Sequence, residues 1–303
     1  MNSMLRNNKL IVSLAALFCC ALWGISTPIV KMGYAYVDAT HVPSLLLWAG
    51  LQFVLAGVLT IGIYSIVSKK FVRPRNESVK GVIVISLLQT VLQYALLYIG
   101  LLYTTSVKGA ILKSTDVFFV TFISSLVFKL EKLTLKKLIS CIIGFTGIIV
   151  MNLKGLSLNI SPLGDGLVVL GIVFYSFAVV ITKLVAKDEN PIVLSGYQMA
   201  LGGVIMLIVS VIFGGNIKFF GILPIILCLS VIYAVSYSLW TILLKHNPAS
   251  KVTIHSFMTP VFGVLTSAFL LSEDGGVAPF NLILALFLVC FGIVLWGYEK
   301  KNS

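Results

Sequence analysis

The sequence predicts an all-α membrane protein, with ten transmembrane helices arranged as two inverted five-helix repeats. Three observations lead to this prediction. The chain is very apolar, its apolar runs are long enough to cross a bilayer, and its two halves carry similar short segments in the same order. Each run is expected to form a helix, because a backbone surrounded by lipid must satisfy its own hydrogen bonds.

The composition excludes a soluble domain of ordinary type. Hydrophobic residues make up 59% of the 303 residues and charged residues only 11%, and the mean hydropathy is +1.07. A soluble chain of this length needs a polar shell that such a composition cannot supply. Apolar windows of roughly 18 residues recur along the whole chain, and each is a candidate transmembrane helix. We therefore expect a polytopic membrane protein.

Proline, glycine and charged residues divide the chain into ten expected spans. The basic and then apolar N-terminus lacks a small-x-small cleavage site, so its apolar run is expected to stay as the first span. Several spans begin at or just after a proline, where the missing N–H costs little. We place the spans at about 10–32, 44–67, 81–103, 108–128, 138–153, 165–186, 191–213, 221–244, 251–271 and 280–297.

The basic residues predict how the chain is oriented. With the N-terminus inside, seventeen lysine and arginine residues fall on the cytoplasmic side, among them Arg6, Lys300 and Lys301, and four fall outside. The positive-inside rule then places both termini in the cytoplasm of a protein in the cell membrane. The net charge of +12 is spread over short loops such as 69–75 and 129–137. This distribution argues against a nucleic-acid partner.

Motifs for enzymatic or metal chemistry are missing from the sequence. It contains no G-x-x-x-x-G-K-[ST] loop, no H-E-x-x-H and no G-x-S-x-G. We expect no enzyme, no cofactor and no metal site. The cysteines lie in apolar runs without metal-ligand spacing, and we expect all five to be buried reduced thiols: Cys19, Cys20, Cys141, Cys228 and Cys290.

Three pairs of segments indicate an internal repeat. LQFVLAG (51–57) and YQMALGG (197–203) share Gln, Leu and Gly at the same spacing. LWGISTPIVK (22–31) and FYSFAVVITK (174–183) each place an aromatic residue eight positions before a lysine. The fourth and ninth spans lead into Glu131 and Glu273, and at that offset Ser114 matches Ser256 while Lys113 lies opposite His255.

The repeat divides the chain at residues 1–153 and 154–303. Because each copy has five spans, the second must enter the membrane from the opposite side. Inverted repeats are typical of secondary transporters, which bind substrate near the midplane between the halves. A duplicated scaffold or sensor is the alternative.

These residues resemble the EamA type of the drug/metabolite transporter superfamily. The resemblance lies in LWGISTPIVK (22–31), in TPVFGVLTSAFLLSE (259–273), in its counterpart DVFFVTFISSLVFKLE (116–131), and in the layout of five plus five spans. It covers essentially the whole chain and implies a ten-helix fold that exports amino acids or other small metabolites, in some members by proton exchange. The chain departs from the family at Gln52, where an arginine is often found, so an anion contact at this position is in doubt.

The segment GAILKSTDVFFV (109–120) places Lys113 and Asp116 inside the fourth span. Their spacing, with that of Gly109, Val120 and Ser124, puts them on one helical face. A charge at this depth costs several kcal/mol unless it faces protein or water, so the face should look into the bundle. Two interpretations stay open. Asp116 binds a substrate amino group and Lys113 a carboxylate, or the pair neutralises itself and Lys113 extends outward to the interface.

The remaining candidates are polar and aromatic residues of other spans. Aromatic rings with hydroxyl and amide groups suit a small amphipathic or cationic solute, although such residues are also common as interfacial anchors. By the repeat we expect Tyr94 and Tyr237 to be deep and adjacent. Weaker candidates complete the expected substrate site: Gln89, Gln93, Trp23 and Gln198.

The ninth span contributes two more candidates. His255 can carry a coupling proton, because histidine titrates near physiological pH; a structural role is the alternative. Pro260, near the middle of the span, is expected to kink the helix and serve as a hinge, unless it only packs.

Together these features predict a secondary transporter that works by alternating access. We expect a small zwitterionic or cationic metabolite, an amino acid above others, as substrate. The bilayer is a further partner, protons are the candidate coupling ion, and the protein is a monomer or homodimer. The rival interpretations are a flippase for an amphipathic lipid-linked carrier and a membrane scaffold or sensor without transport.

Overall fold

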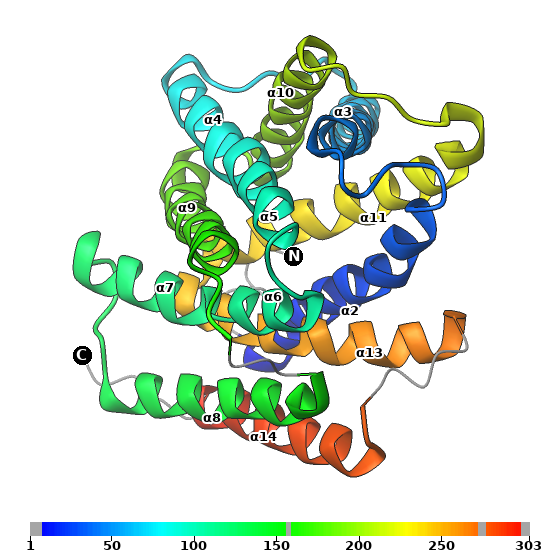
Figure 1. Cartoon of the computed structure of the whole chain (residues 1–303). Coiled ribbons are helices and arrows are strands. Elements are labelled where there is room, and N and C mark those ends of the chain that lie inside the picture. Colours follow the sequence, from blue (N-terminus) through cyan, green and yellow to red (C-terminus); the bar gives the residue numbers. More distant parts are fainter. Residues whose placement is uncertain (1–7, 156–158, 272–276, 298–303) are drawn as a thin grey trace.

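The computed structural model describes residues 8–155, 159–271 and 277–297, and within these ranges every regular element is a helix (Figure 1). Nine helical segments of this part of the chain are long and apolar enough to cross a membrane. The expected all-α membrane protein is therefore confirmed. Arg6, Glu273, Lys300 and Lys301 lie outside the described residues.

In the described part of the chain, seven of the expected spans each correspond to one uninterrupted α-helix. One of them is the fifth expected span, 138–153, which corresponds to α8 with 17 residues. It measures about 25 Å at 1.5 Å per residue, slightly less than the roughly 30 Å of a bilayer's hydrocarbon core. A single 3₁₀ turn, η4 (Leu153–Gly155), follows it. The continuous helices are α2 (Lys9–Gly33), α3 (Val42–Val67), α8 (Leu135–Met151), α9 (Pro162–Asp188), α10 (Pro191–Ile212), α11 (Phe219–His246) and α14 (Pro279–Gly297).

The third, fourth and ninth spans are interrupted. The third contains η1 (Asn76–Ser78), α4 (Val79–Ile85), the π-helix η2 (Ser86–Leu92) and α5 (Gln93–Leu101). The fourth contains α6 (Ser106–Lys113), α7 (Asp116–Phe122) and the π-helix η3 (Ile123–Val127). The ninth contains α12 (Ala249–Thr253), the 3₁₀ turn η5 (Ile254–Phe257) and α13 (Met258–Leu271). Such irregular turns are frequent at functional sites.

One expectation about these spans was wrong. The fourth span is not one continuous helix, because residues 114 and 115 form a turn between α6 and α7. Pro260 lies in the first turn of α13, and its role as a hinge stays a prediction. The irregular turn η5 precedes it, where the missing proline N–H removes a hydrogen bond to the preceding turn.

Two pairs of helices approach each other closely through glycine. A Cβ on Gly57 of α3 would lie 2.5 Å from the Ala200 nitrogen of α10, and one on Gly203 of α10 would lie 2.6 Å from the Val54 nitrogen of α3. At the opposite edge of the bundle, α8 and α14 lie side by side in the same manner (Figure 1). Small residues permit such contacts, which are typical of membrane helices.

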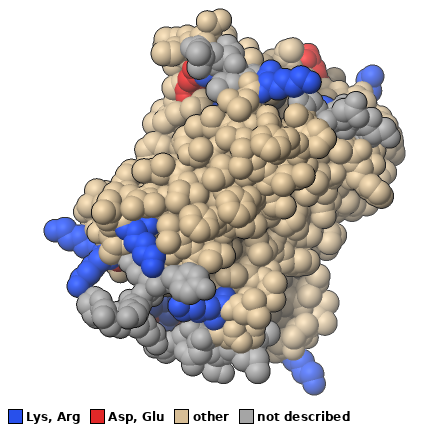
Figure 2. All heavy atoms as spheres, turned by 90° about the horizontal axis from the view of Figure 1, so that it is seen from below, with Lys and Arg blue, Asp and Glu red and all other residues tan. Residues whose placement is uncertain are grey.

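The surface matches a membrane environment. Figure 2 shows Lys and Arg toward two ends of one face, with a broad uncharged band between them. Large apolar side chains are exposed, with Phe220 at 90% and Phe269 at 86%. In lipid such side chains need no further burial. Cys228 and Cys290 are also exposed, so the expectation that all five cysteines are buried was wrong for these two.

Partly buried carboxylates connect the two halves of the chain at both ends of the fourth span. Beyond its end, the Glu131 carboxylate accepts hydrogen bonds from the Lys137 ammonium (3.3 Å), the Ser250 N–H (3.3 Å) and the Ser250 hydroxyl. Near its start, Asp165 of α9 forms an ion pair with Lys108 (2.5 Å) and accepts a hydrogen bond from the Thr104 hydroxyl (2.7 Å). We call these contacts the Glu131 lock and the Asp165 lock.

The glycine contact between α3 and α10 gives a stability prediction. Gly57→Ala should lower the free energy of unfolding by about 1–3 kcal/mol, because its Cβ meets backbone atoms that cannot rotate away. Gly62→Ala in the same helix is the matched control, since nothing lies within 4 Å of its Cβ. Thermal unfolding of the purified protein in detergent measures both. Equal melting temperatures would show that α3 and α10 are not packed this closely.

Candidate functional site

The candidate site lies where the fourth span is interrupted. The Ser114 hydroxyl donates to the Ala110 carbonyl (3.1 Å) and the Thr115 hydroxyl donates to the Leu112 carbonyl (2.6 Å). Such side-chain bonds compete with the helical backbone pattern and favour a break. Lys113 is thus the last residue of α6 and Asp116 the first residue of α7.

Lys113 and Asp116 have separate environments. Among the described residues no ion pair joins them. Asp116 is 7% exposed, and both of its carboxylate oxygens lie 3.1 Å from the Ser256 hydroxyl of η5. Lys113, in contrast, is exposed. The direct pair that would neutralise itself is therefore not formed in this structure.

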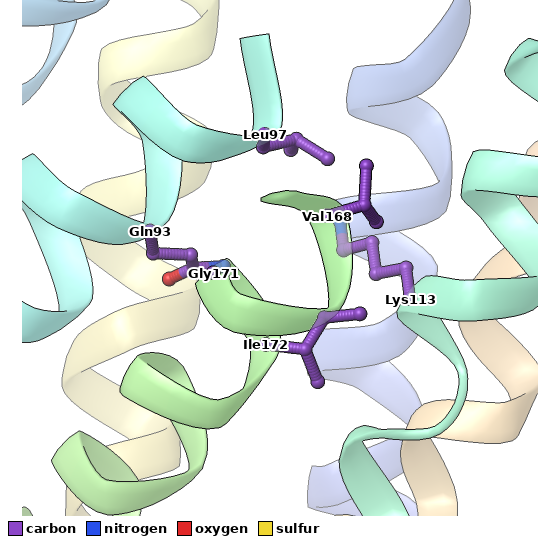
Figure 3. A pocket seen from close by; sticks show the side chains of 6 residues that line it. All are labelled: Gln93, Leu97, Lys113, Val168, Gly171 and Ile172. Carbon is purple, nitrogen blue, oxygen red and sulfur yellow. The ribbon is translucent and has the colours of Figure 1, made fainter. Parts of the chain in front are cut away.

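Lys113 lines a small cavity between α5, α6 and α9. Its volume is about 10 Å³, close to the space one water molecule needs. The side chains of Lys113 and Gln93 extend toward it from different helices, and Gly171 lies between them (Figure 3). The Gln93 side-chain oxygen is buried and has no hydrogen-bond partner in the described part of the chain. The cavity thus combines an ammonium group with an unsatisfied amide. Its lining is Gln93, Leu97, Lys113, Val168, Gly171 and Ile172.

Aromatic rings form a wall beside this region. The hydroxyls of Tyr94 and Tyr237 lie 3.4 Å apart, so the adjacency expected from the repeat is confirmed. The Trp23 ring packs edge-on against Tyr237 and Trp240, with centroid distances of 5.6 and 4.9 Å. Phe53 stacks on Tyr233 at 5.3 Å and contacts Tyr94 at 4.9 Å. The wall therefore joins α2, α3, α5 and α11.

Several buried polar atoms of this region have no hydrogen-bond partner among the described residues. They include the indole nitrogens of Trp23 and Trp240 and the side-chain oxygen of Gln93. An unsatisfied buried polar group costs about 1–3 kcal/mol. Such groups at one place indicate that a ligand or water supplies the partner.

The two other candidate glutamines lie in the same interior. Gln89 is 5% exposed, within the π-helix η2, and lies near Tyr237. Gln198 is 3% exposed, and its side-chain oxygen accepts a hydrogen bond from the Thr90 hydroxyl (3.0 Å). Gln198 therefore ties α10 to η2, whereas Gln89 lies at the aromatic wall.

His255 is buried in η5 next to Ser256. It is 2% exposed, its Nδ1 lies 3.2 Å from the Val252 carbonyl oxygen, and its Nε2 has no partner in the part of the chain that the structure describes. The backbone carbonyl of His255 accepts a hydrogen bond from the Cys20 thiol. A proton-carrying role for His255 stays a prediction.

Two site residues were missed from the sequence. Ser256 contacts Asp116, and Tyr175 of α9 lies near Asp116 and Tyr94. For Ser256 the signal was present. It matches Ser114 in the repeat, and equivalent spans of two inverted copies meet at their common axis. For Tyr175 a signal was also present, because it is the aromatic residue eight positions before Lys183 and so the repeat equivalent of Trp23.

The metal expectation was tested only where residues are described. There, no group of three His, Cys, Asp or Glu side chains is placed to hold a metal ion.

The fold and the site define a multi-pass membrane protein with a polar, charged interior enclosed by apolar helices. The model of the EamA-like transporter family matches residues 10–153 and again residues 162–298. The chain belongs to the EamA-like transporter family, and it is a membrane transporter. The family resemblance seen in the sequence is thereby confirmed.

Individual relatives agree with this assignment. The chain is similar to the uncharacterized transporter YoaV of Bacillus subtilis, with 24% identity over 298 residues, covering 94% of this chain and 96% of the relative. Uncharacterized transporter YvbV of the same organism is 26% identical over 292 residues, covering 94% and 90%. An uncharacterized transporter of Methanothermobacter thermautotrophicus is 27% identical over 204 residues, which is 65% of this chain and 58% of that protein. These names indicate a transporter rather than an enzyme.

A solved structure supports the fold alone. A chain described as "Crystal structure of protein" superimposes with a TM-score of 0.77 over 95% of this chain and 99% of its own length, at 14% identity. Identity this low carries no information about the substrate.

The exposure of Lys113 gives a prediction about water access. In a background without the exposed Cys228 and Cys290, Lys113→Cys should react with a small water-soluble thiol reagent, because the thiolate that reacts forms only in contact with water. Ser114→Cys is the control, since Ser114 is 7% exposed. Modification rates followed by mass spectrometry should differ by about tenfold or more. Equal, slow rates would place Lys113 against lipid.

Proposed function

We propose that the protein is a secondary transporter that exports small zwitterionic or cationic metabolites, amino acids above others, by alternating access. One observation carries the proposal. Lys113 and Asp116 carry opposite charges on either side of a helix break, form no ion pair with each other in the described structure, and lie beside an aromatic wall. Asp116 is buried, and a charge within the membrane interior is costly unless a partner neutralises it.

A zwitterionic solute brings both missing partners. Its carboxylate would accept hydrogen bonds from the Lys113 ammonium and from the Gln93 side-chain NH₂, and its amino group would meet Asp116. Aromatic rings such as Tyr94, Tyr237 and Trp23 suit the cationic end. Their buried indole and phenol groups also supply hydrogen bonds that fix orientation, as in other mostly apolar binding sites.

The proposed architecture is ten transmembrane helices in two inverted copies, residues 1–153 and 154–303, with α8 as the fifth span. The two separate matches of the family model support this division. The packing supports it too, because several helix contacts have an equivalent in the other copy. Helix α2 packs on α11 and α13, as α9 packs on α5 and on α6 and α7, and the equivalent helices pair as α3 with α10 and α8 with α14.

The proposed location is the cell membrane, with both termini in the cytoplasm. Lysines of the expected cytoplasmic set meet at one end of the bundle, which supports the topology. The Lys183 ammonium donates to the Asn247 carbonyl (2.5 Å), and the Lys245 ammonium donates to the Glu189 carbonyl (2.7 Å). We further propose protons as the coupling ion and a monomer or homodimer as the working unit.

The orientation is tested with single introduced cysteines at two exposed loop positions. Asn76→Cys should react with a membrane-impermeant reagent only from the cytoplasmic side, and Asn216→Cys only from outside, because the basic loops stay inside. Labelling of intact cells and of inside-out vesicles provides the comparison. Reaction of Asn216→Cys from the cytoplasm would reverse the orientation.

The charged site is tested by separating binding from folding. Asp116→Asn should weaken the binding of amino acids about 30-fold or more, since one buried charged partner is worth about 2–5 kcal/mol. The variant should still insert and unfold cooperatively. Thermal-shift titration with individual amino acids gives the affinity, and flux into liposomes containing purified protein gives transport.

A double variant distinguishes substrate binding from mutual neutralisation. Replacing Lys113 with Leu and Asp116 with Ala removes both charges together, which is nearly neutral for a pair that only neutralises itself. We expect this variant to fold and to lack transport. Full transport by the double variant would exclude a binding role for the two charges. A wild-type protein that transports no amino acid would favour the alternative function, a flippase for lipid-linked carriers.

A further inference from the structure

The contact between Asp116 and Ser256 joins the two halves of the chain. Asp116 begins α7 in the first half, and Ser256 lies in η5 of the second half, with its hydroxyl 3.1 Å from both carboxylate oxygens. The repeat equivalent of Ser256 is Ser114, whose hydroxyl donates within its own segment to Ala110 (3.1 Å). Only one of the two equivalent serines therefore bridges the halves.

Asp116 has no ion-pair partner in the described structure. The cation nearest to it along the chain is Lys113, which does not reach ion-pair distance. His255 on η5 is turned to the Val252 carbonyl, and the Lys251 ammonium on α12 lies 3.5 Å from the Asn247 side-chain oxygen. The titratable groups that interact with the carboxylate are Cys20 on α2, Lys113 on α6, Cys141 on α8 and Tyr175 on α9. The elements α12 and η5, which also pack against α7, carry Lys251 and His255.

We propose that protonation of Asp116 controls the contact between the two halves through Ser256. An ionised carboxylate accepts a charge-assisted hydrogen bond, which is roughly twice as strong as a neutral one. When the carboxylate takes a proton from water, its oxygens become neutral acceptors and the bond from Ser256 weakens. Release of η5 from α7 then lets the halves move apart, and loss of the proton restores the contact.

Ser256 is a positioning residue in this scheme. It neither titrates nor binds substrate. Its hydroxyl holds η5 against α7 through a hydrogen bond whose strength depends on the charge of Asp116. The inference rests on the proposed transport cycle, because it supplies the step that couples protons to alternating access. It also places the coupling proton on Asp116 rather than on His255.

The experiment follows the halves without any substrate. Spin labels at the exposed Lys132 and Lys187 report the distance between the halves at one end of the bundle, in a background without Cys228 and Cys290. The pH is lowered from mildly alkaline to mildly acidic in lipid nanodiscs. The wild type should shift its distance distribution. Ser256→Ala and Asp116→Asn should show the acid distribution at every pH, with the closed population reduced about fivefold to tenfold at alkaline pH.

Two matched variants separate this role from simple packing. Ser256→Thr keeps the hydroxyl and should keep the response to pH. Ser140→Ala removes a buried hydroxyl that donates only within its own helix α8, to the Lys136 carbonyl (2.9 Å), and should behave as the wild type does.

A wild type that ignores pH, or a Ser256→Ala variant that responds normally, would overturn the proposal. So would a response that survives in Ser256→Ala but disappears in His255→Gln, since the proton would then act at His255. Because no substrate is present, failure here leaves the proposed transport of amino acids standing. A failed flux assay likewise leaves this result standing.

Discussion

The cost of placing charge inside a membrane is the constraint on which the other features of this protein depend. Two oppositely charged side chains lie in the fourth span of a very apolar chain. The packing around them lowers the free-energy cost of these charges. Asp116 meets the Ser256 hydroxyl, and Lys113 lines a small cavity together with Gln93. The polar interior is thus enclosed by helices whose outer faces carry apolar side chains.

The interrupted helices follow from the same constraint. Straight helices satisfy their own backbone and present only side chains to their neighbours. A turn at residues 114 and 115, the π-helices η2 and η3, and the 3₁₀ turn η5 change which side chains face the centre. They lie in the third, fourth and ninth spans, which supply Gln93, Asp116 and Ser256. Irregular backbone at this depth is tolerated where it is enclosed by protein.

The sequence predicted the helical membrane fold and much of the site because both depend on local patterns. Long apolar runs gave the spans, and the repeat placed Tyr94 beside Tyr237. The break after Lys113 was not predicted, because it depends on how Ser114 and Thr115 direct their hydroxyls, and these residues are also compatible with a helix. The exposure of Cys228 and Cys290 was not predicted either, since apolar residues occupy both buried and lipid-facing positions of a membrane helix.

The Glu131 and Asp165 locks have a consequence for how tightly a solute is held. Both are formed in this structure, and the cavity beside Lys113 has room for about one water molecule. Under the proposed transport cycle, a metabolite would bind a rarer arrangement in which one lock is broken and α5, α6 and α9 have separated. Its apparent Kd is the intrinsic Kd divided by the population of that arrangement. Weakening a lock far from the site would then raise apparent affinity without any new contact to the solute, and relatives with the same central residues could differ widely in the concentrations at which they work.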